Sequence, residues 1–142
     1  MEKKISETML GEHGKIDQML KELESCKDCE SDELYVLFNK FKWNVEKHFF
    51  VEEKAIFSLL DKTKGEEVAD TFDLMQEHRK IIEQIKEIED NLNENPDLSE
   101  LKKGLKKHSE FEDQTFYPSL DRTLNDQQKT EIIERAKEII RG

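Results

Sequence analysis

Apolar residues recur along the chain at alternating steps of three and four, in four long blocks. This spacing is the period of an α-helix that buries one stripe of its surface. The pattern therefore predicts four long helices, and every histidine of the chain interrupts one of the stripes. The stripes are Ile5, Met9, His13, Ile16, Leu20 and Leu23; Leu34, Phe38, Phe41, Val45, His48, Glu52, Ala55 and Leu59, widened by Trp43 and Phe49; Thr71, Leu74, His78, Ile81, Ile85, Ile88 and Leu92; and Leu98, Leu101, Leu105, His108, Glu112 and Thr115.

The links between the blocks are short and polar. They read KDCESD, DKTKGEE and NLNENPDLSE. Pro96 cannot continue the helix before it, and Asp97 or Ser99 can cap the next one. Because short links join antiparallel neighbours, we expect an up-down-up-down four-helix bundle made of two hairpins, at about 1–62 and 66–119.

A shorter helix is predicted after the bundle. Pro118 should kink or end the fourth helix, because proline lacks the amide hydrogen and its ring clashes with the preceding turn. Asn125 or Asp126 can then cap a helix at about 126–141, which has an apolar face. We expect this helix to pack across the bundle, and the whole chain, 1–142, to form a single all-α domain.

Composition narrows the class of protein. Charged residues make up 40% of the chain and the formal net charge is -11, with no basic stripe, which argues against a nucleic-acid-binding protein. No apolar run approaches the roughly 20 residues that span a bilayer, so no membrane partner is expected. The start, MEKKISETMLGEH, lacks the apolar segment of a secretory signal, and the expected location is therefore the cytoplasm.

Cys26 and Cys29 form a lone C-x-x-C in ESCKDCESD. A redox pair of this type normally opens a helix after a strand, and a zinc site needs two further ligands nearby. Neither context is visible in the sequence. The favoured prediction is two reduced thiols in a loop, with a redox or metal role as the alternative.

The chain repeats itself. EHGKIDQMLKELE, from Glu12, aligns without gaps on EHRKIIEQIKEIE, from Glu77, and HFFVEEKAIFSLL, from His48, aligns more weakly on HSEFEDQTFYPSL, from His108. Each half contributes one lone histidine and one histidine that is followed four residues later by a glutamate. A two-fold repeat of potential ligands suggests two equivalent metal ions.

The four histidines are predicted to lie at one height in the bundle. In an antiparallel hairpin, two residues are level when they are equidistant from the loop, since both helices rise by about 1.5 Å per residue. The midpoints between consecutive histidines fall at residues 30–31, 63 and 93, each inside a predicted loop. The histidines in question are His13, His48, His78 and His108.

Two glutamates complete the cluster. Residues four apart share a helix face, so His48 with Glu52 and His108 with Glu112 can each bind one metal cluster. Four imidazoles and two carboxylates in a dry core are costly without a cation. Six ligands suit two ions, each held by two imidazoles and by both glutamates as bridges, with positions left open for a small ligand. Imidazole and carboxylate without thiolate favour iron or manganese over a structural zinc.

The residues around the cluster are predicted to be apolar, and should keep the site dry and admit small uncharged molecules. Tyr117 follows Glu112 closely, and a packing role is favoured for it over a role in acid–base chemistry. The sequence thus offers no catalytic residue beyond the metal ligands. The expected apolar shell is Phe49, Phe50, Val51, Ile81, Phe111 and Phe116.

The order His, His-x-x-x-Glu, His, His-x-x-x-Glu on four helices, closed by FEDQTFYP, resembles the hemerythrin-like cation-binding domain family over nearly the whole chain. The resemblance implies a hemerythrin-type bundle with a non-haem di-iron centre, for which manganese or zinc are possible substitutes. It also implies interaction with O2, NO or peroxide, or sensing of iron itself. The ligands that it implies are His13, His48, Glu52, His78, His108 and Glu112.

Two positions depart from the oxygen-carrying members of that family. Leu74 stands where the carriers have a further histidine, and the carriers' last carboxylate corresponds to Asp113, although Glu112 matches the His48–Glu52 pair better. The pattern resembles more closely the family's iron-sensing domains and its proteins that repair iron centres after nitrosative stress. We therefore expect a binding or sensing protein for a small diatomic or peroxide ligand, with a di-iron enzyme of stress defence or iron-centre repair as the alternative.

Overall fold

The computed structural model describes residues 4–26, 28–60 and 67–141. Within those ranges the regular elements are all helical, and no strand occurs. The elements are α1 (Ile5–Glu24), α2 (Ser31–Val51), the π-helix η1 (Glu52–Phe57), α3 (Ser58–Leu60), α4 (Glu67–Asp90), the 3-10 helix η2 (Leu92–Glu94), α5 (Ser99–Phe111), the π-helix η3 (Glu112–Phe116), α6 (Tyr117–Thr123) and α7 (Asp126–Arg141).

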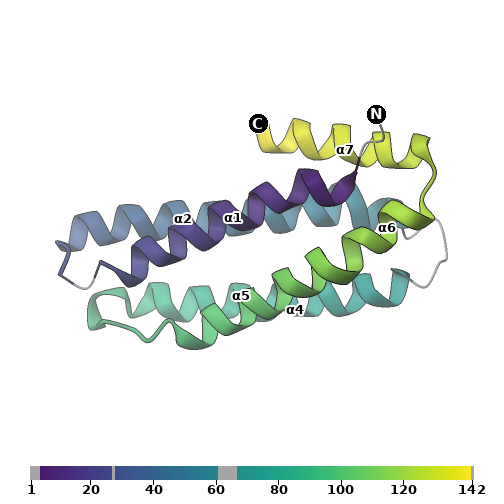
Figure 1. Cartoon of the computed structure of the whole chain (residues 1–142). Coiled ribbons are helices and arrows are strands. Elements are labelled where there is room, and N and C mark those ends of the chain that lie inside the picture. The colour runs from purple at the N-terminus through teal and green to yellow at the C-terminus, as the bar shows by residue number, and fades with distance from the viewer. Residues whose placement is uncertain (1–3, 27, 61–66, 142) are drawn as a thin grey trace.

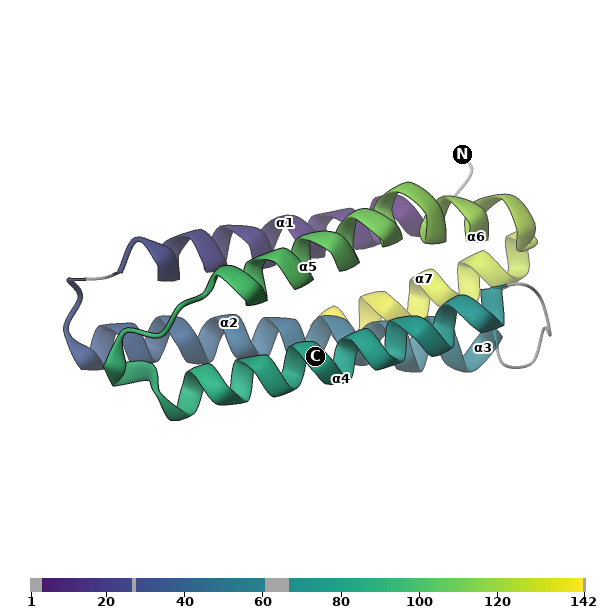
Figure 2. The same ribbon diagram turned by 90° about the horizontal axis from the view of Figure 1, so that it is seen from below.

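Four long rods of helix lie side by side (Figure 1). α1 packs antiparallel to α2, which continues through η1 and α3, and α4 packs against α5, which continues through η3 and α6. Seen from below, α1 and α5 lie on one side of the bundle and α2 and α4 on the other (Figure 2). This arrangement confirms the predicted all-α, up-down-up-down bundle of the hemerythrin type. α7 packs against α1, α2 and η1, so it covers the first hairpin.

Side chains at the helix ends hold the bundle together. Asp121, on α6, accepts hydrogen bonds from the backbone amides of Ile5 at 2.7 Å and Ser6 at 3.3 Å, which places a carboxylate at the N-terminus of α1. At the start of α7, the side chain of Asn125 accepts from the amide of Gln128, and the side chain of Gln128 accepts from the amide of Asn125. This reciprocal pair is a capping box, and it makes Asn125, of the two predicted residues, the cap.

The link between α4 and α5 turns at Asn95 and Pro96. Asn95 adopts a left-handed conformation with φ 54°, which asparagine tolerates better than most residues do. Asp97 then accepts a hydrogen bond from the backbone amide of Ser99 at 2.9 Å, at the start of α5. The preceding helix ends before Pro96, as predicted, but the N-cap position of α5 is Leu98, so the prediction of Asp97 or Ser99 as the cap is wrong. Asp97 bonds to the first turn from one residue further out.

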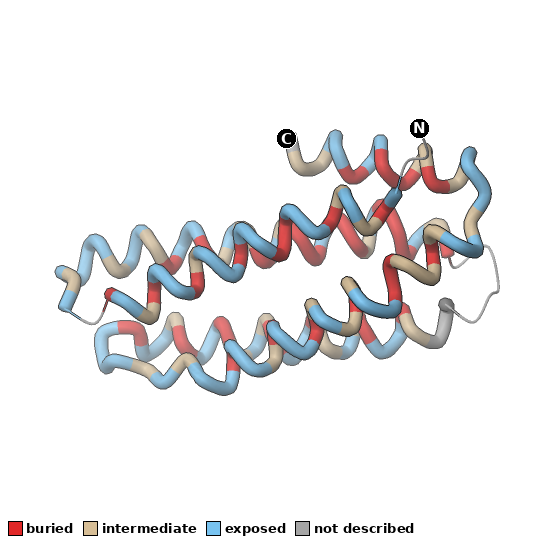
Figure 3. The backbone as a smooth tube through the Cα atoms, viewed as in Figure 1, coloured by how far each residue is buried: buried red, intermediate tan, exposed pale blue. Residues whose placement is uncertain are grey.

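Buried residues recur along each helix of the bundle (Figure 3). The core consists of two apolar clusters with a polar layer between them. The four histidines and the two glutamates of the predicted site form this layer, and all six are buried. One cluster contains Met9, Val51, Leu74, Phe116 and residues of α7, among others. The other contains Ile16, Val45, Ile81, Leu105 and further residues towards the links between α1 and α2 and between α4 and α5.

The second and fourth helical rods each contain a π-helical segment, which the sequence analysis did not predict. These segments change which residues are buried at the ends of the two stripes. In η1 the amide of Ser58 donates to the carbonyl of Glu53, and in η3 the amide of Tyr117 donates to that of Glu112, each over five residues. The wider turn moves the buried face by about one residue. Thr115 is consequently exposed, and the stripe of the first hairpin ends on Leu60 in place of the half-buried Leu59.

Pro118 does not end the helical rod, so this part of the prediction of a kink or an end is wrong. It follows η3 and lies in the first turn of α6, where an amide hydrogen is not needed for the helix. The rod therefore continues to Thr123.

For two aromatic residues of α2, the sequence predicted a position on the buried face of the helix, and the structure places them on the exposed face. Trp43 does not widen the buried stripe of α2, since it is 61% exposed, and Phe50 does not belong to the shell of the site, since it is 49% exposed. Each lies two residues from a core position, at Phe41 and His48 respectively, and two residues turn a helix by about 200°. Both side chains therefore point away from the core.

Cys26 and Cys29 are joined in a disulfide, so the prediction of two reduced thiols is wrong. The chain turns tightly after α1, where the amide of Cys29 donates to the carbonyl of Cys26. The turn brings the two Cα atoms to 5.1 Å, within the range of disulfides.

The predicted loop after the first hairpin, which contains the midpoint residue 63, lies outside the described residues. None of the described helices combines the length and the apolar character needed to cross a membrane.

Candidate metal centre

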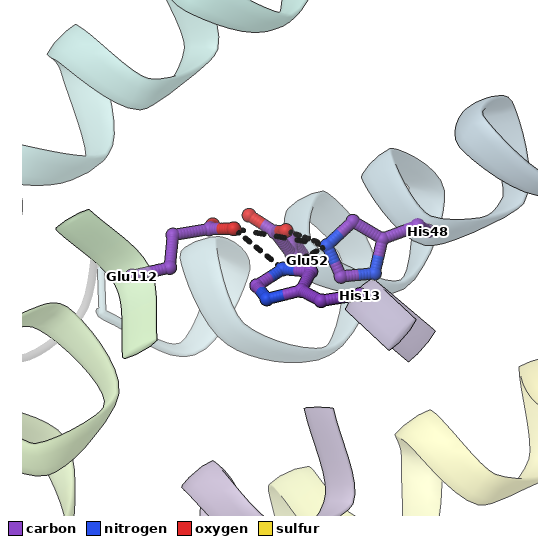
Figure 4. Close-up of side chains that lie close together, drawn as sticks. All are labelled: His13, His48, Glu52 and Glu112. Carbon is purple, nitrogen blue, oxygen red and sulfur yellow. Dashed lines mark hydrogen bonds and ion pairs between the residues drawn. The ribbon is translucent and has the colours of Figure 1, made fainter. Parts of the chain in front are cut away.

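The structure brings all six predicted side chains into one cluster in the polar layer. Each helical rod contributes to it, and the two glutamates are the first residues of the two π-helices. Figure 4 shows four of the six side chains pointing towards one another. The contributors are His13 of α1, His48 of α2, Glu52 of η1, His78 of α4, His108 of α5 and Glu112 of η3.

The first group of potential ligands combines both histidines of the first hairpin with both glutamates. His13, His48, Glu52 and Glu112 each offer one ligand atom, and these atoms lie within 4.8 Å of one another. Nε2 of His13 lies 2.9 Å from Nε2 of His48 and 3.0 Å from Oε1 of Glu112. Nε2 of His48 lies 2.5 Å from Oε1 of Glu52 (Figure 4).

The second group combines both histidines of the second hairpin with the same glutamates. Glu52, His78, His108 and Glu112 again offer ligand atoms within 4.8 Å of one another. Nε2 of His78 lies 3.3 Å from Oε2 of Glu52, and Nε2 of His108 lies 3.3 Å from Oε1 of Glu112. Glu52 and Glu112 are thus common to both groups, whereas each histidine belongs to one.

Carboxylates outside the cluster contact the far side of the imidazoles. Nδ1 of His13 donates a hydrogen bond to Asp113 at 2.9 Å. Burial alone would lower the pKa of His13, but the hydrogen bonds to Asp113 and Glu112 raise it. Nδ1 of His78 lies 3.4 Å from Oε1 of Glu53. A carboxylate at Nδ1 fixes the ring and leaves Nε2 facing the cluster.

His108 has an outer contact of the same kind. Its Nδ1 lies 3.4 Å from Oε1 of Glu77, and the hydrogen bond with His108 lowers the pKa of Glu77. Sequence reasoning missed Glu53 and Glu77 as outer residues, and considered Asp113 only as an inward ligand in place of Glu112. A usable signal was present, because each of them is the direct neighbour of a predicted ligand.

The electrostatics of the cluster favour positive charge. Burial alone would lower the pKa of His48, but the charges of Glu52 and Glu112, with hydrogen bonds to them, raise it to about 10. His108 behaves alike: burial lowers its pKa, the charge of Glu112 opposes burial most strongly, and the net pKa is about 10. Burial would raise the pKa of Glu52, but His48 holds it well below its usual range. The carboxylates thus stabilise positive charge on the inward imidazoles, and a metal cation can supply that charge in place of the protons.

The six inward side chains leave polar atoms unpaired that a metal ion could bind. Four inward atoms are buried without a hydrogen-bond partner: Oε2 of Glu52, Oε2 of Glu112, Nε2 of His78 and Nε2 of His108. Some of these atoms lie at ion-pair distance, but their directions do not make hydrogen bonds. Since buried polar atoms are almost always paired, a cation among these atoms would satisfy what the protein leaves unsatisfied. Nitrogen and carboxylate oxygen without sulfur is a donor set suited to iron and manganese.

Aromatic rings cover the cluster on both sides. Phe49 stacks on His78 with ring centroids 3.8 Å apart, and Phe57 stacks on His78 at 5.7 Å. Tyr117 stacks on His13 at 5.9 Å, and its hydroxyl donates a hydrogen bond to Oε1 of Glu52 at 3.1 Å. Burial raises the pKa of Tyr117 well above its usual value, and the nearby carboxylates add to the effect. Tyr117 is therefore more than the packing residue that the sequence suggested.

The structure also places the residues at the two positions where this chain differs from the oxygen-carrying members of the family. Leu74 is fully buried in the apolar cluster with Phe116, so no polar atom approaches the site there. Glu112 points into the cluster, and Asp113 contacts the outer side of His13. The geometry thus favours Glu112 over Asp113 as an inward carboxylate.

The fold and this cluster define an all-α bundle built around a cation-binding centre. The family model of the hemerythrin HHE cation binding domain matches residues 4–120, and the chain belongs to that family. A search of curated proteins and a search of solved structures gave no match. The matched range includes all six candidate ligands and ends before α7.

Proposed function

We propose that this chain is a non-haem di-iron protein that binds or senses O2, a related small molecule such as NO or peroxide, or iron itself. The observation that carries the proposal is the pair of overlapping ligand groups, which share Glu52 and Glu112 and take two histidines each. In the proposal the two glutamates bridge the irons, and manganese or zinc can substitute. When bound, a pair of irons supplies open positions for a small ligand.

The chain's own residues would give the centre its selectivity. Phe49 covers the side of one apolar cluster, and Phe57 and Tyr117 cover the side of the other. Such a shell excludes bulk water and favours small uncharged molecules. Leu74 removes the fifth histidine position of the carriers, which supports sensing or handling of reactive species over oxygen transport.

Metal analysis tests the proposal directly. The purified chain is loaded with Fe(II) without oxygen, desalted and analysed, and we expect about two irons per chain by the ligand count above. An optical spectrum taken before and after air exposure then reports whether oxygen reacts with the centre and whether the change reverses. About one zinc and no iron would mean a structural metal and would contradict the proposal. Glu110→Ala, on the exposed face of α5, is the matched control and should keep full iron content.

A second candidate function is a di-iron enzyme of nitrosative or oxidative stress defence or of iron-centre repair. The observation in its favour is the buried hydroxyl of Tyr117 beside Glu52, since an O–H at this place can deliver a proton. With a reductant supplied, multiple turnovers of NO or peroxide that disappear in His48→Ala would establish it. Absence of turnover in the iron-loaded protein would leave only binding or sensing.

A further inference from the structure

The outer carboxylates follow the internal repeat of the chain. The repeat relates His13 to His78 and Asp113 to Glu53, and the contact of His13 with Asp113 has its counterpart in that of His78 with Glu53. Both contacts join the first helix of one hairpin to the second helical rod of the other hairpin. The cluster is therefore two-fold symmetric beyond the six inward side chains.

The remaining outer contact has no counterpart. Glu77 contacts Nδ1 of His108 within the second hairpin. The repeat relates Glu77 to Glu12 and His108 to His48, so symmetry expects Glu12 at Nδ1 of His48. In the structure, Nδ1 of His48 is buried and has no hydrogen-bond partner.

Glu12 is itself an incompletely paired buried group. Its side chain is 10% exposed, compared with 37% for that of Glu77. The one charged partner recorded for it among the described residues is Lys15, with Nζ 4.0 Å from Oε2 and a side chain that is 62% exposed. A buried carboxylate with a partner at this distance gains little from it.

We propose that Glu12 accepts a hydrogen bond from Nδ1–H of His48 when the centre holds its metals, and is the fourth outer carboxylate of the site. The inference rests on the proposed function, because the contact orients an imidazole whose Nε2 faces the ions. Nδ1 of His48 is buried without a hydrogen-bond partner, and the carboxylate of Glu12 has only a distant cation at 4.0 Å. The donor and the acceptor are complementary. Glu12 is a positioning residue: it holds the ring and its tautomer and does not touch the metal.

With the contact between Glu12 and His48, all four imidazoles would have the same kind of partner at each ring nitrogen. Each histidine would then have Nε2 inward and one carboxylate at Nδ1, an arrangement that strengthens a metal-binding imidazole. Loss of such an outer partner typically lowers metal affinity by about 10- to 100-fold. Glu12→Gln keeps the size of the side chain and removes the charge, so it tests the contact with little change in packing.

Two readouts test the proposal, with zinc as a diamagnetic probe. The first is zinc affinity, which we expect to fall by about 10-fold or more in Glu12→Gln and in the positive control Glu77→Gln. The second is the NMR signal of the imidazole N–H protons. Glu12→Gln should shift or broaden the Nδ1–H signal of His48 and leave those of His13, His78 and His108 in place.

Lys15→Gln tests whether Glu12 acts through its surface ion pair with Lys15 instead of through His48. It should change neither readout, and if it reproduced the effect of Glu12→Gln, the proposal would be wrong. An unchanged His48 signal in Glu12→Gln, with Glu77→Gln affecting His108, would also overturn it. The zinc-loaded protein keeps this test separate from the proposed function: wild-type protein that binds zinc but fails to bind two irons refutes the di-iron proposal, and the His48 signal of the zinc-loaded protein still reports on Glu12.

Discussion

The two halves of the bundle share a ligand pattern and differ in what surrounds it. The first half, 5–60, and the second half, 67–123, each place two histidines and one glutamate in the polar layer, and each opens a π-helix at the glutamate. A π-helical turn often marks a functional site. Because both halves keep the turn at the same place, the repeat preserves the backbone that carries the ligands as well as the ligands themselves.

One difference lies directly at the centre. The repeat relates Phe57 to Tyr117, and each ring stacks on a histidine of the other half, Phe57 on His78 and Tyr117 on His13. Only Tyr117 of this pair carries a hydroxyl, which reaches Glu52. The two groups of candidate ligands, alike in composition, are therefore unequal in their surroundings.

A second difference lies away from the centre. The first half is covered by α7, and a disulfide closes its link, whereas the link of the second half turns through Asn95 and Pro96. A cavity of about 730 Å³ lies between these two links, lined by both cysteines and by none of the six candidate ligands. The two halves are thus most alike at the ligand cluster, and they differ most at the links between helices and on the outer surface.

The largest effect is expected from the shared glutamates. Glu52→Ala or Glu112→Ala should lower the metal content towards zero, because each carboxylate belongs to both ligand groups. The bundle should stay folded, since the two apolar clusters lie on either side of the polar layer. Metal analysis and far-ultraviolet circular dichroism check both statements. An unchanged iron count would mean that the bridging ligand is wrongly assigned.

A smaller loss is expected from single histidines, and it should be equal in the two halves. His13→Ala and His78→Ala each remove a ligand from one group only, so each should leave about one metal per chain. Metal analysis of both variants side by side makes the comparison. If one variant lost both metals and the other lost one, the halves would not be equivalent in their ligands.

Much of this arrangement could be predicted from the sequence. The height of His48 and its partners followed from the helical rise and from where the polar links fall, which are local properties. The outer contacts could not be predicted in this way. Glu53 and Asp113 lie one residue after an inward glutamate, about 100° further round the helix, and only the packing of neighbouring helices decides what they reach.

The π-helices were missed for a related reason. A single wide turn adds about one residue to the register and leaves no period of its own in the sequence. The available signal was two large apolar or aromatic residues in succession after each inward glutamate, Ile56 with Phe57 and Phe116 with Tyr117, and the structure buries all four. A stripe whose positions are three or four residues apart can include only one residue of each consecutive pair.

An intermediate effect is expected at the unequal aromatic pair. Tyr117→Phe makes this aromatic pair alike and removes one of the two contacts of Oε1 of Glu52, the other being Nε2 of His48. Loss of a hydrogen bond to a buried carboxylate should lower the free energy of unfolding of the metal-free protein by about 1–3 kcal/mol. The loss should be smaller with metal bound, since the cation then satisfies the carboxylate. Urea unfolding with and without metal measures both values. Tyr35→Phe, at a tyrosine that is 54% exposed, is the control and should have no effect. Equal losses with and without metal would mean that the hydroxyl does not act through Glu52.

The smallest effect is expected from the disulfide that distinguishes the first half. It joins residues only three apart in sequence, and closing so short a loop restricts the unfolded chain by about 2 kcal/mol at most. Cys26→Ser with Cys29→Ser, or reduction with a dithiol, should therefore lower the free energy of unfolding by no more than that amount. Metal content should stay at the wild-type value, because both cysteines lie beyond the apolar cluster of Leu20 and Leu23, away from the imidazoles. Urea unfolding and metal analysis of the oxidised and reduced protein make the measurement. A reduced protein that lost metal would show that the link and the centre are coupled, and the repeat alone would then not explain the site.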